Sequence, residues 1–192
     1  MTYYFLYYEN LHTRTLRKAG VITVKVIETD RLVLRWQTLE DAPFILTLVN
    51  DPSWLQFIGD RGVRTEEDAR RYIENSALAY YQRDGFGFYL TELKEGNVPI
   101  GICGMIKRDT LEDVDIGFAF LPDYRSKGYA FEAASAVLAY ARDVVGLKRI
   151  VAITDQDNHA SGRLLEKIGL REEGTIQLGN NPEELRLFAI NF

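Results

Sequence analysis

The chain has 192 residues, 46% of them hydrophobic and 27% charged, and a formal net charge of −5. This length is typical of one domain with a substantial core, and this composition excludes a disordered chain. The acidic balance gives no support for nucleic-acid binding, which usually needs a basic face. The single cysteine, Cys103, lies in an apolar run, so it forms no internal disulfide and is expected to be a small buried hydrophobe. The two histidines belong to no Cys/His cluster, which indicates no metal site.

The chain carries no signal for a membrane or for secretion. No segment reaches the roughly 18 apolar residues of a spanning helix, and the aromatic start lacks the features of a signal peptide. We therefore expect a cytoplasmic protein without a membrane partner. Residues 1–20 are aromatic and then basic, unlike the rest. We expect them to be an N-terminal extension, either an appended segment, a translated upstream region or a docking helix, and residues 21–192 to form a single domain.

Short strands and helices are expected in the first part of this domain. The β-branched residues 21–27 predict a strand, and alternating apolar residues predict another over 32–36. Helical spacing predicts a helix that begins between Thr38 and Asp41 and ends before Asn50. Residues 54–59 are expected to be a loop or short helix. A second long helix is expected over 65–82, with Thr65 and Asp68 capping its start.

The second part of the domain changes from a meander to alternating elements. Three antiparallel strands are expected first, over 86–93, 99–107 and 114–121. Helices and strands then alternate, with helices over 128–145 and 158–168, and strands over 149–154, 170–178 and 185–191. This order predicts one mixed α/β sheet domain.

The most informative segment is the basic turn between the apolar strand at 114–121 and the helix that begins near Gly128. The first backbone N–H groups of a helix have no intrahelical partner, and the helix dipole favours an anion there. Gly128 allows a phosphate to approach the backbone, Ala130 keeps the next position small, and Arg125 and Lys127 can add charge. The segment therefore predicts a pyrophosphate site, with a plain strand–turn–helix as the alternative. The other nucleotide-binding glycine motifs are absent.

The run Arg125-Ser126-Lys127-Gly128-Tyr129-Ala130 resembles the Q/R-x-x-G-x-G/A pattern with which GNAT superfamily N-acetyltransferases hold the CoA pyrophosphate. Segments 30–35, 115–118 and 158–170 resemble three further motifs of the family, in the same order. The resemblance covers residues 27–192. It implies a GNAT-type α/β (α+β mixed sheet) fold, in which about four helices flank a mostly antiparallel sheet of about six to seven strands with a splayed strand pair.

The resemblance also implies acetyl-CoA as co-substrate and no metal. In the family, a β-bulge before the turn opens the strand, so the backbone of Phe118, Ala119 and Phe120 would pair with the pantetheine arm. Asn158 would bind the same arm, although by spacing alone it can equally be an N-cap. The pyrophosphate would lie on Arg125, Ser126, Lys127, Gly128, Tyr129 and Ala130.

The implied reaction is direct transfer of the acetyl group to a primary amine, with a backbone N–H stabilising the carbonyl oxygen. Many family members have a tyrosine as general acid where this chain has Leu165, and in this it resembles the RimJ/RimL-like branch. Ser161 is then the candidate for protonating the leaving thiolate. Asp115 is the candidate base, directly or through water, if burial raises its pKa; the alternative is a solvent-facing carboxylate at a strand edge. Glu132 is expected to be structural.

The acceptor side is less defined by the sequence. Trp54, Phe57, Tyr89 and Arg186 are candidates for lining a cleft, although aromatics at such positions are more often core. The expected acceptor is a protein N-terminus or a small-molecule amine, and the protein is expected to be a monomer or homodimer. Two alternatives remain open, a non-catalytic acyl-CoA-binding or sensor module and a nucleotide binder that does not take CoA.

Overall fold

The computed structural model describes residues 14–18, 21–179 and 182–192. Its strands are β1 (Arg14–Lys18), β2 (Val21–Glu28), β3 (Leu32–Arg35), β4 (Phe88–Leu93), β5 (Val98–Ile106), β6 (Val114–Phe120), β7 (Arg149–Thr154), β8 (Arg171–Gln177) and β9 (Glu184–Asn191). Its α-helices are α1 (Ala42–Val49), α2 (Pro52–Phe57), α3 (Glu66–Ile73), α4 (Ala79–Asp84), α5 (Tyr129–Tyr140) and α6 (His159–Lys167). Short helical turns are η1 (Leu39–Asp41), η2 (Glu74–Leu78), η3 (Pro122–Tyr124) and η4 (Ala141–Val145).

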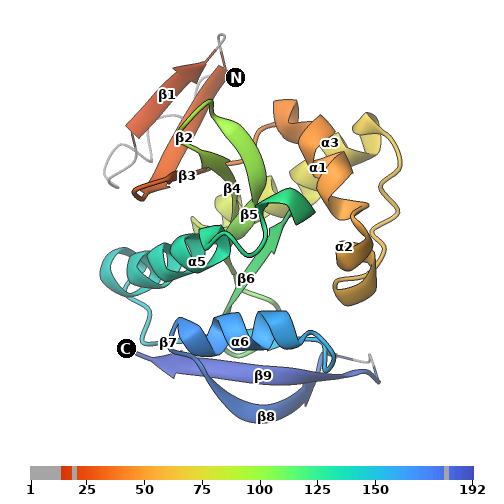
Figure 1. Cartoon of the computed structure of the whole chain (residues 1–192), viewed down its shortest axis with the longest axis vertical. Helices are drawn as coiled ribbons and strands as arrows, with labels where there is room; N and C mark the ends of the chain where they lie inside the picture. The colour runs from red at the N-terminus through yellow and green to blue at the C-terminus, as the bar shows by residue number, and fades with distance from the viewer. Residues whose placement is uncertain (1–13, 19–20, 180–181) are drawn as a thin grey trace.

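The strands form one sheet in the order β1-β2-β3-β4-β5-β6-β7-β9-β8 (Figure 1). The pair β6–β7 is parallel and the other pairs are antiparallel. The predicted mixed α/β sheet is therefore confirmed. The described residues hold nine strands, more than the six or seven expected, partly because Arg14–Lys18 pairs with β2 as an edge strand. Residues 1–13, 19–20 and 180–181 lie outside the described ranges.

Local sequence accounts for the helices. Thr65 and Asp68 form a reciprocal capping box at the start of α3, as predicted. The single helix expected over 65–82 is α3 and α4 joined by the π-type turn η2, and the helix expected over 128–145 ends in a second such turn, η4. Within the described residues, no helix is long and apolar enough to cross a membrane.

Two layers of helices bury the two faces of the sheet. Helix α5 packs Ala133, Ala134 and Val137 against one face, where Cys103 is fully buried as predicted. Helices α1 and α3 pack on the other face, against Leu90 and Ile102 among others. Figure 1 shows α1, α2 and α3 grouped beside the sheet, whereas α5 crosses the middle of the molecule and α6 lies against β7, β9 and β8.

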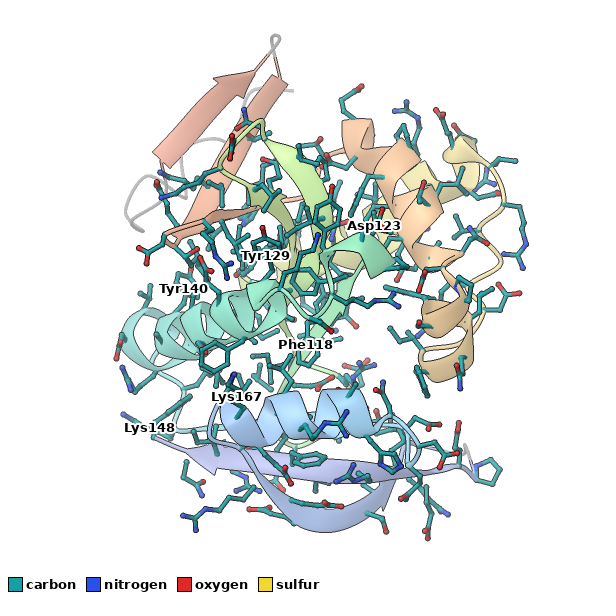
Figure 2. The ribbon with its side chains drawn as sticks, in the orientation of Figure 1. Phe118, Asp123, Tyr129, Tyr140, Lys148 and Lys167 are labelled. Atoms are coloured by element: carbon teal, nitrogen blue, oxygen red, sulfur yellow. The ribbon has the colours of Figure 1, made fainter. Side chains whose placement is uncertain are left out.

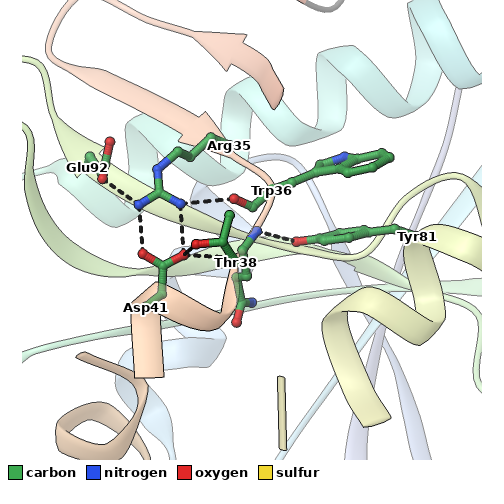
Figure 3. Close-up of polar contacts among 7 residues, drawn as sticks. Arg35, Trp36, Thr38, Asp41, Tyr81 and Glu92 are labelled. Carbon is green, nitrogen blue, oxygen red and sulfur yellow. Dashed lines mark hydrogen bonds and ion pairs between the residues drawn. The ribbon is translucent and has the colours of Figure 1, made fainter. Parts of the chain in front are cut away.

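A buried ion network joins β3 to α1 and β4 (Figure 3). The Arg35 guanidinium donates to both carboxylate oxygens of Asp41 at 2.8 Å and to Glu92 at 2.7 Å. The bidentate geometry and the second carboxylate compensate the cost of burying this charge. Asp41 also accepts the Thr38 backbone N–H at 2.8 Å. The network thus fixes the start of the α1–α3 layer on the sheet.

The sheet opens between β6 and β7. Their pairing is limited to Val114 with Ile150 and Asp115 with Val151, and beyond Asp115 the two strands part. On its other side β6 stays paired with β5 in unbroken register from Asp115 to Phe120. The splayed pair is therefore present, but the expected β-bulge is absent. The opening arises because β7 diverges together with β9, to which it pairs along its whole length.

Candidate active site

Two cavities adjoin at the splayed strands. The turn cavity, of about 580 Å³, lies between the turn before α5 and the start of α6, and is lined by Arg125, Ser126 and Gly128 among others. The second cavity, called the inner cavity, has a volume of about 320 Å³ and is lined by the buried Asp115, Arg108 and others. The two share part of their walls, and the common residues include Phe118, Ala119, Asn158 and Ser161. A molecule bound along β6 can therefore reach from one cavity into the other.

The turn before α5 has the backbone geometry of an anion site. Gly128 caps α5 with φ of 83°, and Ser126 also has a positive φ, of 59°. The first helical hydrogen bond joins Glu132 N–H to the Gly128 carbonyl, so the amides before it have no acceptor within the helix. A Cβ on Gly128 would lie 3.2 Å from Arg31 Nη2. Both the positive φ and this close neighbour favour glycine here.

Arg31 and Glu132 contact this turn and the first turn of α5. Arg31 donates from Nη1 to the Lys127 carbonyl at 3.1 Å and from Nε to Glu132 at 2.6 Å, and it stacks 4.4 Å above the Tyr129 ring. Glu132 also accepts the Thr29 hydroxyl at 2.6 Å. Burial would raise the pKa of Glu132, but these donors outweigh it and lower the pKa. These contacts support the structural role expected for Glu132.

Arg125 points toward the protein rather than toward the rim of the turn. Its nitrogens donate to the Phe120 carbonyl at 2.8 Å, to Ser53 Oγ at 2.7 Å and to Asp51 Oδ1 at 2.5 Å. Asp51 is buried and caps α2 by accepting the Ser53 N–H at 3.1 Å. Burial would raise the pKa of Asp51, but Arg125 and the Ser53 and Trp54 backbone N–H groups together outweigh it, and the pKa is lowered. Arg125 therefore ties the turn to α2.

Other basic residues supply charge near the turn cavity. Lys127 Nζ lies 5.9 Å from the centre of the Tyr124 ring, and neither Lys127 nor Tyr129 is among the residues lining the turn cavity. Arg163 and Lys167 of α6 do line it, and Figure 2 shows Lys167 on the side of α6 that faces α5. Sequence reasoning missed these two cations, because their position across the cavity depends on how α6 packs.

The end of β6 forms the wall between the cavities. Phe118, Ala119 and Phe120 pair with β5 on one side, and β7 has already diverged on the other. Figure 2 shows Phe118 in the middle of the molecule, between α5 and α6. This edge therefore carries backbone groups that another extended chain can pair with.

The start of α6 closes the other wall. Asn158 is its N-cap, and its side-chain oxygen accepts the Ser161 N–H at 3.1 Å. The capping role left open by the sequence is thus present, and both residues also line both cavities. Leu165 is buried and lines the inner cavity, where it can donate no proton.

Asp115 is a buried carboxylate in the inner cavity. Its side chain is 2% exposed and its Oδ2 accepts from Arg108 Nε at 2.6 Å. Burial raises the pKa of Asp115 to about 6, although Arg108 and the Ile153 backbone N–H act to lower it. The alternative of a solvent-facing carboxylate at a strand edge is therefore wrong. Asp115 combines burial with a pKa near neutrality, which is typical of a general base.

The expectations for the acceptor side are half correct. Trp54 and Phe57 line both cavities, whereas Tyr89 and Arg186 line neither. Tyr89 is fully buried in the core between Tyr81 and Tyr140, because β4 is an inner strand of the sheet, paired on both sides. Arg186 pairs with Glu172 across β8 and β9 and stacks on Phe188.

The inner cavity also has a polar wall that sequence reasoning missed. It consists of residues on one side of α3, η2 and α4, namely Tyr72, Asn75, Ser76 and Tyr80, with Arg61 from the preceding loop. The spacing i, i+3, i+4 and i+8 places the four helical residues on one helical face. That spacing could have predicted the wall from the sequence. It places hydroxyl and amide groups on one helical face, whereas the inward face of a core helix is apolar.

A family model described as the acetyltransferase (GNAT) domain matches residues 31–171. The chain belongs to the GNAT acetyltransferase family. The GNAT chain is 31% identical to the uncharacterized N-acetyltransferase YoaA of Bacillus subtilis, over 79% of this chain and 86% of that protein. It is 32% identical to YnaD of the same organism, over 77% and 84% of the two chains.

Solved structures agree with this membership. A GNAT-family acetyltransferase from Bacillus anthracis is 31% identical, with a TM-score of 0.72 over 86% of this chain and 97% of that one. RimL, a ribosomal L7/L12 alpha-N-protein acetyltransferase, has the same fold, with a TM-score of 0.78 at 17% identity over 93% of this chain and 100% of that chain. The protein is thus an acyltransferase that uses acetyl-CoA as donor.

The site fits a CoA-type group by its own geometry. A diphosphate matches the helix-start amides at a glycine with positive φ, and an amide-bearing arm matches the open edge of β6. Among the described residues, no group of three or more His, Cys, Asp or Glu side chains is arranged to hold a metal ion.

Proposed function

We propose that this GNAT enzyme transfers an acetyl group directly from acetyl-CoA to a primary amine on a small molecule or a protein N-terminus. One observation carries the proposal: buried Asp115 lies in a cavity that shares Phe118, Ala119, Asn158 and Ser161 with the cavity at the Gly128 turn. The donor site and the proton acceptor thus meet along one open strand.

For the donor, we assign the pyrophosphate to the backbone amides of residues 126–130, since the Arg125 N–H already donates to the Pro122 carbonyl at 3.1 Å. Arg125 acts there as a positioning residue through Asp51 and Ser53, and Lys127 and Tyr129 act through the main chain. The backbone of Phe118, Ala119 and Phe120 and the side chain of Asn158 would hold the pantetheine arm. When bound, acetyl-CoA supplies an acyl group activated as a thioester.

For the acceptor, Asp115 takes the proton that an ammonium must lose before its nitrogen becomes a nucleophile, directly or through a water. A pKa of about 6 leaves its carboxylate ionised at neutral pH, and Arg108 supports that form. A backbone N–H on the open edge of β6 would donate to the carbonyl oxygen as it gains charge. Ser161 would donate to the leaving sulfur, and a thiol with a reference pKa of about 8.5 needs little acid assistance.

We also propose that the chain belongs with the RimJ/RimL-like enzymes and acts in the cytoplasm. Leu165 at the position of the usual acidic tyrosine, together with Ser161 one helical turn earlier, supports this placement. The fold shared with RimL is compatible with it, although at that identity it speaks for the fold alone.

The test is thiol release from acetyl-CoA across a panel of amines, amino acids and short peptides. We expect at least one amine to be acetylated, with product mass increased by one acetyl group. The alternative of a non-catalytic acyl-CoA-binding module is favoured if acetyl-CoA binds in calorimetry but no amine is turned over.

Gly128→Glu is the control for the donor site. The carboxylate enters the phosphate site and the residue must adopt a positive φ, so we expect acetyl-CoA binding to be lost at a folding cost of about 1–2 kcal/mol. Gly128→Ala shares the backbone cost without the charge, so it should keep more affinity than Gly128→Glu. Normal acetyl-CoA affinity in Gly128→Glu would contradict the assignment of the turn.

A further inference from the structure

The charges that line the inner cavity do not balance. They are Arg61, Arg108 and Asp115, two cations against one carboxylate. Arg108 is paired with Asp115. Arg61 forms no ion pair with any residue in the described ranges, and its one hydrogen bond given by the structure runs from Nη2 to the Ile58 carbonyl at 3.3 Å. The cavity therefore presents the exposed Arg61 guanidinium, which has no ionic partner among the described residues, beside a carboxylate that is paired with Arg108.

The two guanidinium groups act on the same part of the cavity. Burial raises the pKa of Tyr72, and the charges of Arg61 and Arg108 both oppose that rise. Tyr72 lies on the polar wall with Asn75, Ser76 and Tyr80. The positive charge thus faces a wall that also offers hydroxyl and amide groups, which together suit an anionic oxygen group.

This arrangement fits a zwitterion better than a simple amine. A plain alkylammonium ion gains from Asp115 but is repelled by the surplus cation. An amine that also carries a carboxylate can place its ammonium at Asp115 and its carboxylate at Arg61, whose planar fork binds carboxylates through two bonds. The cavity volume of about 320 Å³ is at the small end for ligand sites, and the aromatic rings of Trp54, Phe57 and Phe88 are part of its lining.

We infer that the acetyl acceptor is a small primary amine bearing a carboxylate, of amino-acid size, and that Arg61 binds this carboxylate. The inference rests on the proposed function and narrows its substrate class. Arg61 is assigned as a specificity-determining residue, and Asp115 keeps its role at the amine.

The experiment compares matched acceptors: tyrosine with tyrosinamide and tyramine, and leucine with leucinamide and isoamylamine. We expect kcat/KM for each acid to exceed that for its amide by about tenfold or more, because a charge-assisted bond is lost in the amide. Arg61→Gln should reduce this ratio to about twofold or less by raising KM for the acid, with KM for acetyl-CoA unchanged. Arg64→Gln is the matched control, since Arg64 is in the same loop, pairs with Asp60 and lines neither cavity.

Calorimetry with the same compounds in the presence of CoA separates this inference from the proposed function. If the acids bind more tightly than the amides, and Arg61→Gln removes the difference, the inference holds even without turnover. Equal or better binding of the amides and amines, or no binding of any acid, would overturn it. Acetylation of peptides in clear preference to free amino acids would overturn it as well, while leaving the proposed function in place.

Discussion

The reactivity of the site depends on where one carboxylate lies. Asp115 is at the last pair that β6 forms with β7, so it is buried in the sheet yet borders the inner cavity. Its neighbours act in opposite directions on its pKa: burial raises it, whereas Arg108 and the Ile153 N–H lower it. The shorter side chain of aspartate, compared with the glutamate common in the family, is thereby held by Arg108 at a fixed position.

This environment predicts the pH dependence of the reaction. The pKa is raised from 3.8 to about 6, so the proton-accepting form predominates above about pH 6. We expect kcat/KM to fall as pH falls through about 6, approaching tenfold per pH unit on the acid side. Asp115→Asn should lower kcat about 100-fold or more and remove this acid limb, with acetyl-CoA affinity unchanged. Initial rates of the wild type and of Asp115→Asn between pH 5 and 9 check both predictions. If Asp115→Asn keeps the fall in rate at low pH, that fall belongs to another group.

At the scale of elements, the turn before α5 and the helix α2 are one unit. Arg125 connects them through Asp51 and Ser53, and the next residue of α2, Trp54, lines both cavities. The donor turn and the wall of the acceptor cavity are thus joined by one side chain. A substitution in the turn should therefore change the affinities for both acetyl-CoA and the acceptor.

Arg125→Ala tests this connection. Asp51 would keep its buried charge without its partner, so we expect a loss of about 1–3 kcal/mol in the free energy of unfolding. Acetyl-CoA affinity should fall about tenfold, because the turn loses its anchor. Lys127→Ala removes the exposed cation two residues away and should change stability by less than about 0.5 kcal/mol. Urea unfolding and calorimetry measure the two effects, and equal results for the two variants would contradict the anchoring role.

At the scale of the whole molecule, the sheet consists of two parts joined by a short contact. Strands β1 to β6 form one part and β7, β9 and β8 the other, and two residue pairs between β6 and β7 connect them. Helix α5 lies over the first part and α6 over the second (Figure 1), and residues of both helices line the turn cavity. A molecule bound along the open edge of β6 would bridge both parts.

Binding of acetyl-CoA should therefore stabilise the domain as a unit. At a concentration of about 100 times Kd, the gain is about 2.7 kcal/mol, which raises Tm by roughly 5–10 °C for a domain of this size. Amide exchange should slow at residues 117–120 and 126–130, and β2 and β3 should change least. Thermal melting and hydrogen-exchange mass spectrometry check this, with Gly128→Glu as a variant that should show no shift. Slowing confined to surface loops would place the ligand elsewhere.

Local patterns in the sequence predicted most of the strands and helices, and they predicted the turn before α5 as an anion site. The strand predicted at 149–154 is Arg149–Thr154, and the capping box at Thr65 is present, because alternation, helical spacing and caps are local properties. The role of Gly128 at the start of a helix was also predictable, because a helix start and its free amides depend only on residues close in the sequence. One strand, at 14–18, was missed because an edge strand of basic residues has no apolar period.

The side-chain contacts of the site follow from how the elements pack. Arg125 turns to Asp51, Tyr89 enters the core, Arg186 pairs with Glu172, and Arg61 and Tyr72 come to one cavity with Asp115. The open edge of β6 arises because β7 stays paired with β9 and diverges from β6 with it, and not because of a bulge in β6. Such contacts join residues that are 14 to 74 positions apart, as for Arg186 with Glu172 and Arg125 with Asp51, so the packing of helices and strands sets the partners. A pKa near 6 at Asp115 likewise follows from burial, which no local pattern in the sequence records.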